Sequence, residues 1–158
     1  MEINRLYLTG ILLVIYFVII ILLILKRKHL GPNIANFTIS MVFVFLAELF
    51  STIGKAIYGE QFNSTPFMSG GVIICSFSAV LIYYYKILEK RRSKNIQLGI
   101  VCLNFLNIIL SVIFIDDFFS FLPYVTYFIT IFLLLLSITL FFFETFNSFI
   151  KFQNCSKI

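Results

Sequence analysis

The sequence predicts an all-α integral membrane protein, a bundle of five transmembrane helices. Composition is the first reason, because 61% of the 158 residues are hydrophobic, 12% are charged and the mean hydropathy is +1.05. A soluble domain carries about 25% charged residues. The second reason is a series of apolar runs, each long enough to cross a hydrocarbon core of roughly 30 Å. The third is that basic residues gather in short clusters beside these runs, the pattern that orients membrane proteins.

The first span is predicted over residues 6–25, a run free of charged residues. At about 1.5 Å per residue, a helix of this length matches the hydrocarbon core. The basic cluster Lys26-Arg27-Lys28-His29 follows directly. A secretory signal peptide carries its positive charge before a shorter apolar core. The run is therefore predicted to be a retained helix.

The second and third spans are predicted over residues 34–57 and 67–85. Pro32 precedes the second span and suits the first turn of a helix, where its missing N–H has no partner to lose. A polar loop separates the two spans. The third span ends in Tyr83-Tyr84-Tyr85, a sequence typical of the aromatic belt at a membrane interface.

The last two spans are predicted over residues 96–115 and 121–143. The very short connection between them begins at Asp116-Asp117, so these helices should form an antiparallel hairpin. Residues 144–158 are expected to form a short cytoplasmic tail that can lie along the membrane surface for a turn or two. The whole chain, 1–158, is predicted to be a single polytopic domain.

The distribution of charge predicts an N-terminus outside and a C-terminus in the cytoplasm. With five spans in this orientation, all but two of the twelve Lys and Arg residues are cytoplasmic, the exceptions being Arg5 and Lys55. A four-span alternative, with residues 34–57 on the membrane surface, would put the two main basic clusters on opposite faces. The pattern therefore favours five spans and a multi-pass protein of the cell membrane.

The inventory of reactive side chains is too thin for an enzyme. The single histidine, His29, lies in a basic cluster, and no Ser/His/Asp or Cys/His arrangement includes it. The three cysteines lack the spacing of a zinc site. Asp116-Asp117 has no third carboxylate nearby to complete a cation site. We therefore expect no catalytic residues, no metal and no cofactor, and, since the basic clusters flank apolar runs, no binding of nucleic acid.

Two sets of residues are predicted to hold the helices together. Gly71, Cys75 and Ala79 recur at steps of four in the third span, and such small residues let helices approach closely in lipid. Asn104 and Asn107 lie on one face of the fourth span. Their amides need partners in lipid, so we favour interhelical hydrogen bonds over a solute path along this face.

Glu48 is the most informative residue, because an ionisable side chain within a span costs roughly 2.5–3.5 kcal/mol to insert. Thr52 and Lys55 follow it along the same side of the predicted helix. Glu48 either fixes packing or has a functional role. We predict that it faces the bundle interior, close to polar residues of the third or fourth span. Glu48, Thr52, Asn104 and Asn107 together are the candidate intramembrane polar site.

Two functions are consistent with this sequence. The first is a small non-enzymatic membrane protein, an accessory, immunity or assembly factor for another membrane component. Its partners would be the lipid bilayer and either a membrane protein or further copies of itself. The alternative is an oligomeric transporter or proton-coupled carrier that uses Glu48, with Asn104 and Asn107 lining the path. A membrane-embedded enzyme is less favoured than either.

Overall fold

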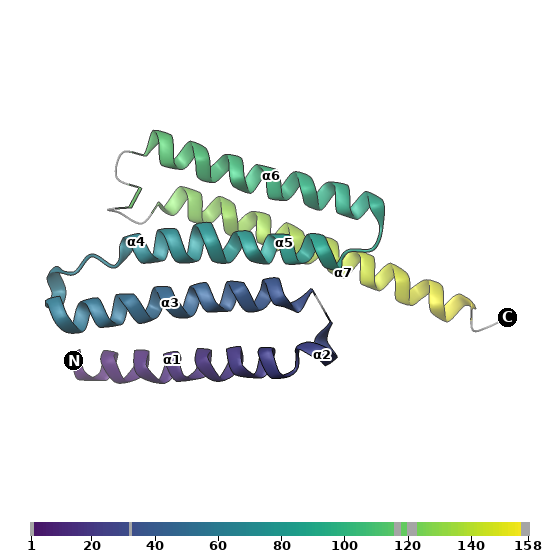
Figure 1. Cartoon of the computed structure of the whole chain (residues 1–158). Helices are drawn as coiled ribbons and strands as arrows, with labels where there is room; N and C mark the ends of the chain where they lie inside the picture. The colour runs from purple at the N-terminus through teal and green to yellow at the C-terminus, as the bar shows by residue number, and fades with distance from the viewer. Residues whose placement is uncertain (1, 32, 116–117, 120–122, 156–158) are drawn as a thin grey trace.

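Five long helices joined by short connections make up the computed structural model of the chain (Figure 1). The structure describes residues 2–31, 33–115, 118–119 and 123–155, with the backbone alone for residues 2–6, 60 and 148–155. In the described part, five helices are long and apolar enough to cross a membrane: Tyr7–Leu25, Ile34–Tyr58, Thr65–Ile87, Arg91–Phe114 and Tyr124–Asn147. The five predicted spans are thus confirmed by length and composition, as expected of a multi-pass membrane protein.

Nine elements build these spans and the turns between them in the described residues. In chain order they are α1 (Glu2–Leu25), α2 (Arg27–Leu30), α3 (Ile34–Tyr58), η1 (Gly59–Gln61), α4 (Thr65–Phe67), η2 (Met68–Ser76), α5 (Phe77–Ile87), α6 (Arg91–Phe114) and α7 (Tyr124–Cys155). The third span is continuous through α4, η2 and α5, and its middle part, η2, is a π-helix. A π-helix makes i→i+5 hydrogen bonds, which changes the spacing of residues that share a face.

Two glycines turn the chain at the ends of helices. Gly31 follows α2 with φ +87°, and Gly59 follows α3 with φ +67°. Residues other than glycine rarely adopt this left-handed backbone conformation, so glycine is the residue best suited to both turns.

The helices pack in an open row and not in a closed ring. α1 packs against α3 and the short α2, α3 packs against η2 and α5, and α5 packs against α6 and α7, which also pack against each other. Figure 1 shows α1, α3 and α5 as successive layers, with the α6–α7 pair beyond them. α1 is therefore the outermost helix, with 6% of its span buried in the protein against 22–28% for the other four.

Both basic clusters lie at the same end of the bundle. α2 and the turn between α5 and α6 lie at the same end in Figure 1, and residues 26–29 and 86–94 carry the basic side chains there. We call this the basic end. α3 runs the length of the bundle between α1 and η2, as a five-span arrangement requires.

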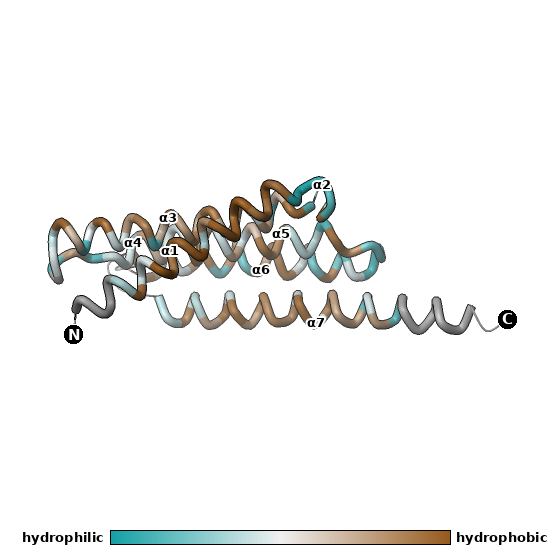
Figure 2. The backbone as a smooth tube through the Cα atoms, turned by 90° about the horizontal axis from the view of Figure 1, so that it is seen from below, coloured by the Kyte–Doolittle hydropathy of each residue, from teal (hydrophilic) through white to brown (hydrophobic). Residues whose placement is uncertain are grey.

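Two helices are longer than predicted. α6 begins at Arg91, ahead of the predicted residue 96, and α7 continues to Cys155, beyond the predicted residue 143. Neither Gly nor Pro occurs after Pro123 to end α7. Residues 144–155, predicted as part of a short tail, continue α7, which extends past the other helices at the basic end in Figure 1. In Figure 2 the coloured part of α7 carries mostly hydrophobic residues.

The apolar core lies between α5, α6 and α7. Leu81, Ile100 and Leu133 form its buried centre, with Val101 and Leu134 packed against it. The remaining buried positions between these three helices are mostly polar.

Candidate functional site

A polar seam runs along the contact between α6 and α7. The buried residues of α6 recur every three or four positions: Ser93, Gln97, Ile100, Asn104, Ile108 and Ser111. Those of α7 follow the same spacing up to Ser137, and a step of seven leads to the last: Thr126, Thr130, Leu133, Ser137 and Glu144. This spacing places each set on one helix face. The two helices thus turn polar faces toward each other and leave apolar side chains outside, as suits a lipid environment.

Gln97 joins three helices at one level of the seam. Its Nε2 donates to the main-chain oxygen of Leu81 on α5 at 3.0 Å and to Oγ of Ser137 on α7 at 2.9 Å. Gln97 is fully buried, and its Oε1 makes no hydrogen bond with the described residues. Its placement thus favours the contact between these helices, although one acceptor is left unused.

Asn104 and Asn107 both bind neighbouring helices, which is the role that the sequence favours for them. Asn104 Nδ2 donates to Oγ of Ser78 on α5 at 3.2 Å. Asn107 Nδ2 donates to the main-chain oxygen of Thr126 at 3.3 Å and to Oγ1 of Thr130 at 3.4 Å, both on α7. Thr126 in turn donates to Oγ of Ser111 at 2.5 Å. These contacts link α5, α6 and α7 through polar groups.

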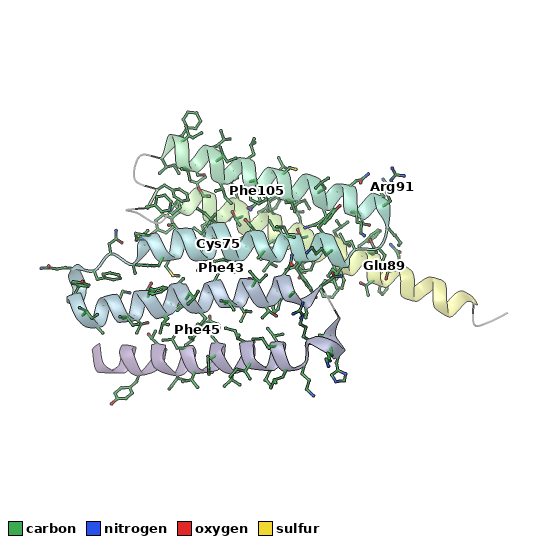
Figure 3. All side chains as sticks on the ribbon, viewed as in Figure 1. Phe43, Phe45, Cys75, Glu89, Arg91 and Phe105 are labelled. Carbon is green, nitrogen blue, oxygen red and sulfur yellow. The ribbon has the colours of Figure 1, made fainter. Side chains whose placement is uncertain are left out.

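Glu144 closes the seam at the basic end. Its side chain is 7% exposed, and its Oε1 accepts hydrogen bonds from the main-chain N–H groups of Glu89 at 2.7 Å and Lys90 at 3.0 Å. Ser93 also donates to this carboxylate. These groups precede or open α6, so Glu144 caps that helix from α7, where a negative charge complements the helix dipole. Figure 3 shows Glu89 and Arg91 at this turn, beside α7.

The contact between α3 and η2 depends on small side chains. A Cβ atom added at Gly71 would lie 2.9 Å from Cβ of Ala47 and 3.5 Å from the main-chain oxygen of Phe43. One π-turn further along, Ser76 Oγ lies 2.7 Å from Oγ of Ser40. Figure 3 labels Phe43 on α3 and Cys75 on η2 in this region.

The small-residue face of the third span follows the π-helix. Gly71 makes the close approach expected of it, and the next contact with α3 comes from Ser76, five residues later. Cys75 and Ala79, which the step of four grouped with Gly71, are half-buried, as Gly71 itself is. An α-helical period does not describe a π-helical segment, and the two contacts with α3, at Gly71 and Ser76, are five residues apart and not four.

Glu48 lies apart from the polar seam. Its side chain is half-buried on α3, and the hydroxyl of Thr52 donates to its main-chain oxygen at 2.7 Å. Within the described residues, no hydrogen bond or ion pair reaches the Glu48 carboxyl. The polar contact that we expected with the third or fourth span is therefore not present there.

The four residues of the candidate polar site fall into two separate places. Glu48 and Thr52 are on α3, whereas Asn104 and Asn107 are on α6, and these two helices flank η2–α5 from different sides (Figure 1). The sequence did not identify Gln97, Ser137 and Glu144 as partners of the asparagines. Their spacing along α6 and α7 is the signal that would have found them.

No group of three or more His, Cys, Asp or Glu side chains is placed to hold a metal ion in the part of the chain that the structure describes.

The chain matches no protein-family model, and comparison with curated proteins and with solved structures found no match.

Proposed function

We propose that this chain is a non-enzymatic, multi-pass protein of the cell membrane that binds another membrane component. It would serve that component as an accessory, immunity or assembly factor. The observation that supports the proposal is the Glu48 carboxyl, which lies within the span Ile34–Tyr58 without a hydrogen bond or ion pair among the described residues.

The observation matters because inserting a charged side chain into a membrane costs free energy. A charged side chain at the centre of a span costs roughly 2.5–3.5 kcal/mol, and such residues usually face a polar interior or a partner. The amides of Gln97, Asn104 and Asn107 find hydrogen bonds on neighbouring helices of the same chain. Glu48 does not, and so a contact from outside the chain is the explanation we favour.

The outer position of α1 and α3 supports an external contact. α1 packs mainly on α3 and α2 among the described elements, which leaves one side of the bundle thinly covered. The outward face of α1 carries a shallow apolar hollow lined by Tyr7, Gly10, Ile11, Val14 and Ile15. A partner helix can therefore reach this side without displacing the polar seam.

The proposed orientation has the N-terminus outside and the C-terminus in the cytoplasm. Its support is the location of residues 26–29 and 86–94 at one end of the bundle. Basic residues accumulate on the cytoplasmic side of membrane proteins.

The alternative is an oligomeric transporter or proton-coupled carrier that uses Glu48. It has less support, because Glu48 on α3 and the asparagines on α6 belong to separate places. The asparagine side chains are also engaged in hydrogen bonds between helices.

Photo-crosslinking in the native membrane tests the proposal. Val44, one turn before Glu48 on α3, is replaced by a photoreactive phenylalanine, and Leu106, a 55% exposed residue of α6, serves as the control position. We expect one discrete adduct from Val44, identified by mass spectrometry as a membrane component, and none from Leu106. Absence of an adduct, together with Glu48-dependent solute flux by the purified chain in proteoliposomes, would favour the transporter.

A further inference from the structure

We infer that the partner is a membrane-spanning helix of a different protein that presents a basic side chain, Lys or Arg, at the depth of Glu48. The inference rests on the proposed function and gives the chemistry of the group that Glu48 binds. Three properties of Glu48 support it: its charge, the access to its carboxyl and its depth in the membrane.

Charge comes first. Glu48 is the only acidic residue inside the predicted spans of this chain. Lys55 is the only basic residue in the same helix, seven positions further on, which is about 10 Å along the helix axis. No described ion pair joins the two residues. The carboxylate therefore has no opposite charge of its own, and a basic side chain is the complement that favours its ionised form.

Access comes second. Ala47, the residue before Glu48, is buried against Gly71 of η2. Successive side chains of an α-helix point about 100° apart. The Glu48 side chain therefore lies at the edge of the contact between α3 and η2, where it is half-buried. The Thr52 hydroxyl, one turn further on, donates its hydrogen bond to the main-chain oxygen of Glu48 and not to the Glu48 carboxyl. The carboxyl is thus available from the side of α3.

Depth excludes a second copy of this chain as the source of the basic group. Copies related by a rotation axis along the membrane normal keep each residue at the same depth. Glu48 of one copy would then face the level of Glu48 in the other, and Lys55 would lie about 10 Å away along the axis. Two carboxylates at one level repel each other, so a like copy offers no complement.

The Glu48 and Lys55 pair also gives the contact a register. Two opposite charges, separated by two turns on one side of α3, match only a partner helix with the reverse order of charges at the same depths. Such a pattern discriminates between partners, because a shifted helix would bring like charges together.

Designed leucine-rich transmembrane helices provide the probe. One carries a single Lys at the depth of Glu48, a second carries Gln there, a third has Leu throughout, and a fourth carries Lys two turns nearer the basic end. Each is labelled as a fluorescence acceptor and mixed in phosphatidylcholine vesicles with the full chain labelled as donor. We expect the wild-type chain to bind the matched Lys helix about 3- to 30-fold more strongly than the Leu helix, the range measured for polar contacts between membrane helices.

Variants of the chain assign this preference to the carboxyl. Glu48→Asp should keep the preference for the matched Lys helix, and Glu48→Gln should abolish it. Thr139→Val is the control, because Thr139 is exposed on α7 and bonds only its own helix at the Leu135 oxygen. It should leave the preference unchanged.

Three results would overturn the inference. The first is equal binding of the Lys and Leu helices, and the second is binding of the Gln or displaced Lys helix as strong as that of the matched Lys helix. The third is Glu48-dependent energy transfer between two labelled copies of the chain that exceeds transfer to the Lys helix. A Val44 adduct that persists in Glu48→Gln would overturn the pairing while the proposed function stands. A Lys preference without any Val44 adduct in the native membrane would count against the proposed function alone.

Discussion

The close contact between α3 and η2 makes Gly71 the position where the addition of one methyl group should be most informative. The Cβ atom introduced by Gly71→Ala would lie 2.9 Å from Cβ of Ala47, a short side chain with no flexible end to move aside. Ordinary carbon contacts lie at about 3.5–4.0 Å. Helices α3 and η2 would therefore have to separate by several tenths of an ångström or more.

The neighbouring residue Gly70 supplies a matched control. It is in the same π-helix, and a Cβ atom added there meets nothing within 4 Å. Both substitutions gain roughly 0.5–1 kcal/mol from the reduced conformational freedom of Ala relative to Gly. Gly71→Ala alone should lose about 1–3 kcal/mol through overpacking. The free energy of unfolding of Gly71→Ala should thus fall below that of Gly70→Ala by about 1–3 kcal/mol.

Reversible unfolding in mixed micelles, followed by circular dichroism, measures this difference between the two purified variants. Gly71→Leu should widen it further, because a larger side chain must fit the same contact. Unfolding of Gly70→Ala and Gly71→Ala at the same denaturant concentration, or a higher stability of Gly71→Ala, would contradict overpacking at Gly71.

The remaining predictions concern topology and the polar seam. Reporter fusions after residues 29, 94 and 158 should report the cytoplasm and those after 62 and 118 the outside; a cytoplasmic signal at 62 would show that α3 does not cross. Glu144→Ala should destabilise the bundle by about 2–3 kcal/mol in the same unfolding assay, since it removes a charged acceptor from two part-buried N–H groups. Glu89→Ala, at an exposed side chain on the same turn, should change little, and equal effects would contradict the capping role. Asn104→Leu should cost about 0.6–2 kcal/mol, the value of an interhelical hydrogen bond in a membrane protein, and an unchanged stability would show that its bond to Ser78 contributes nothing.

The sequence predicts the five helices well because each membrane span corresponds to a long run of apolar residues. The first span ends at Leu25 both in the prediction and in the structure, where the basic cluster follows it. The start of α6 was harder to place, because Arg91 to Asn95 look like a polar loop until Glu144 supplies the cap. That cap comes from a residue far along the chain, which no local pattern reveals.

For each of these polar contacts, the sequence predicted only one of the two partners. Asn104 and Asn107 were recognised because amides are rare in an apolar run, whereas Ser137 and Thr130 were overlooked because short hydroxyl side chains are common in membrane helices. The π-helical η2 was not predicted, because a shift from i→i+4 to i→i+5 hydrogen bonds leaves no clear signature in composition. Which spans are neighbours also depends on tertiary packing, and so the separation of Glu48 from Asn104 became apparent only in the structure.

The order of hydrogen-bond partners along the chain has a consequence for biosynthesis. A ribosome delivers the chain from the N-terminus, so Ser78 and the Leu81 carbonyl precede Asn104 and Gln97, which bind them. When α6 leaves the translocation channel, these two amides therefore meet acceptors that are already in the bilayer. Asn107 and the amino-terminal turn of α6 differ, because their partners, Thr130 and Glu144, are synthesised later. The nascent α6 can thus pack on α5 first. When α7 follows, it completes the assembly by supplying hydrogen-bond partners to Asn107 and to the amino-terminal turn of α6.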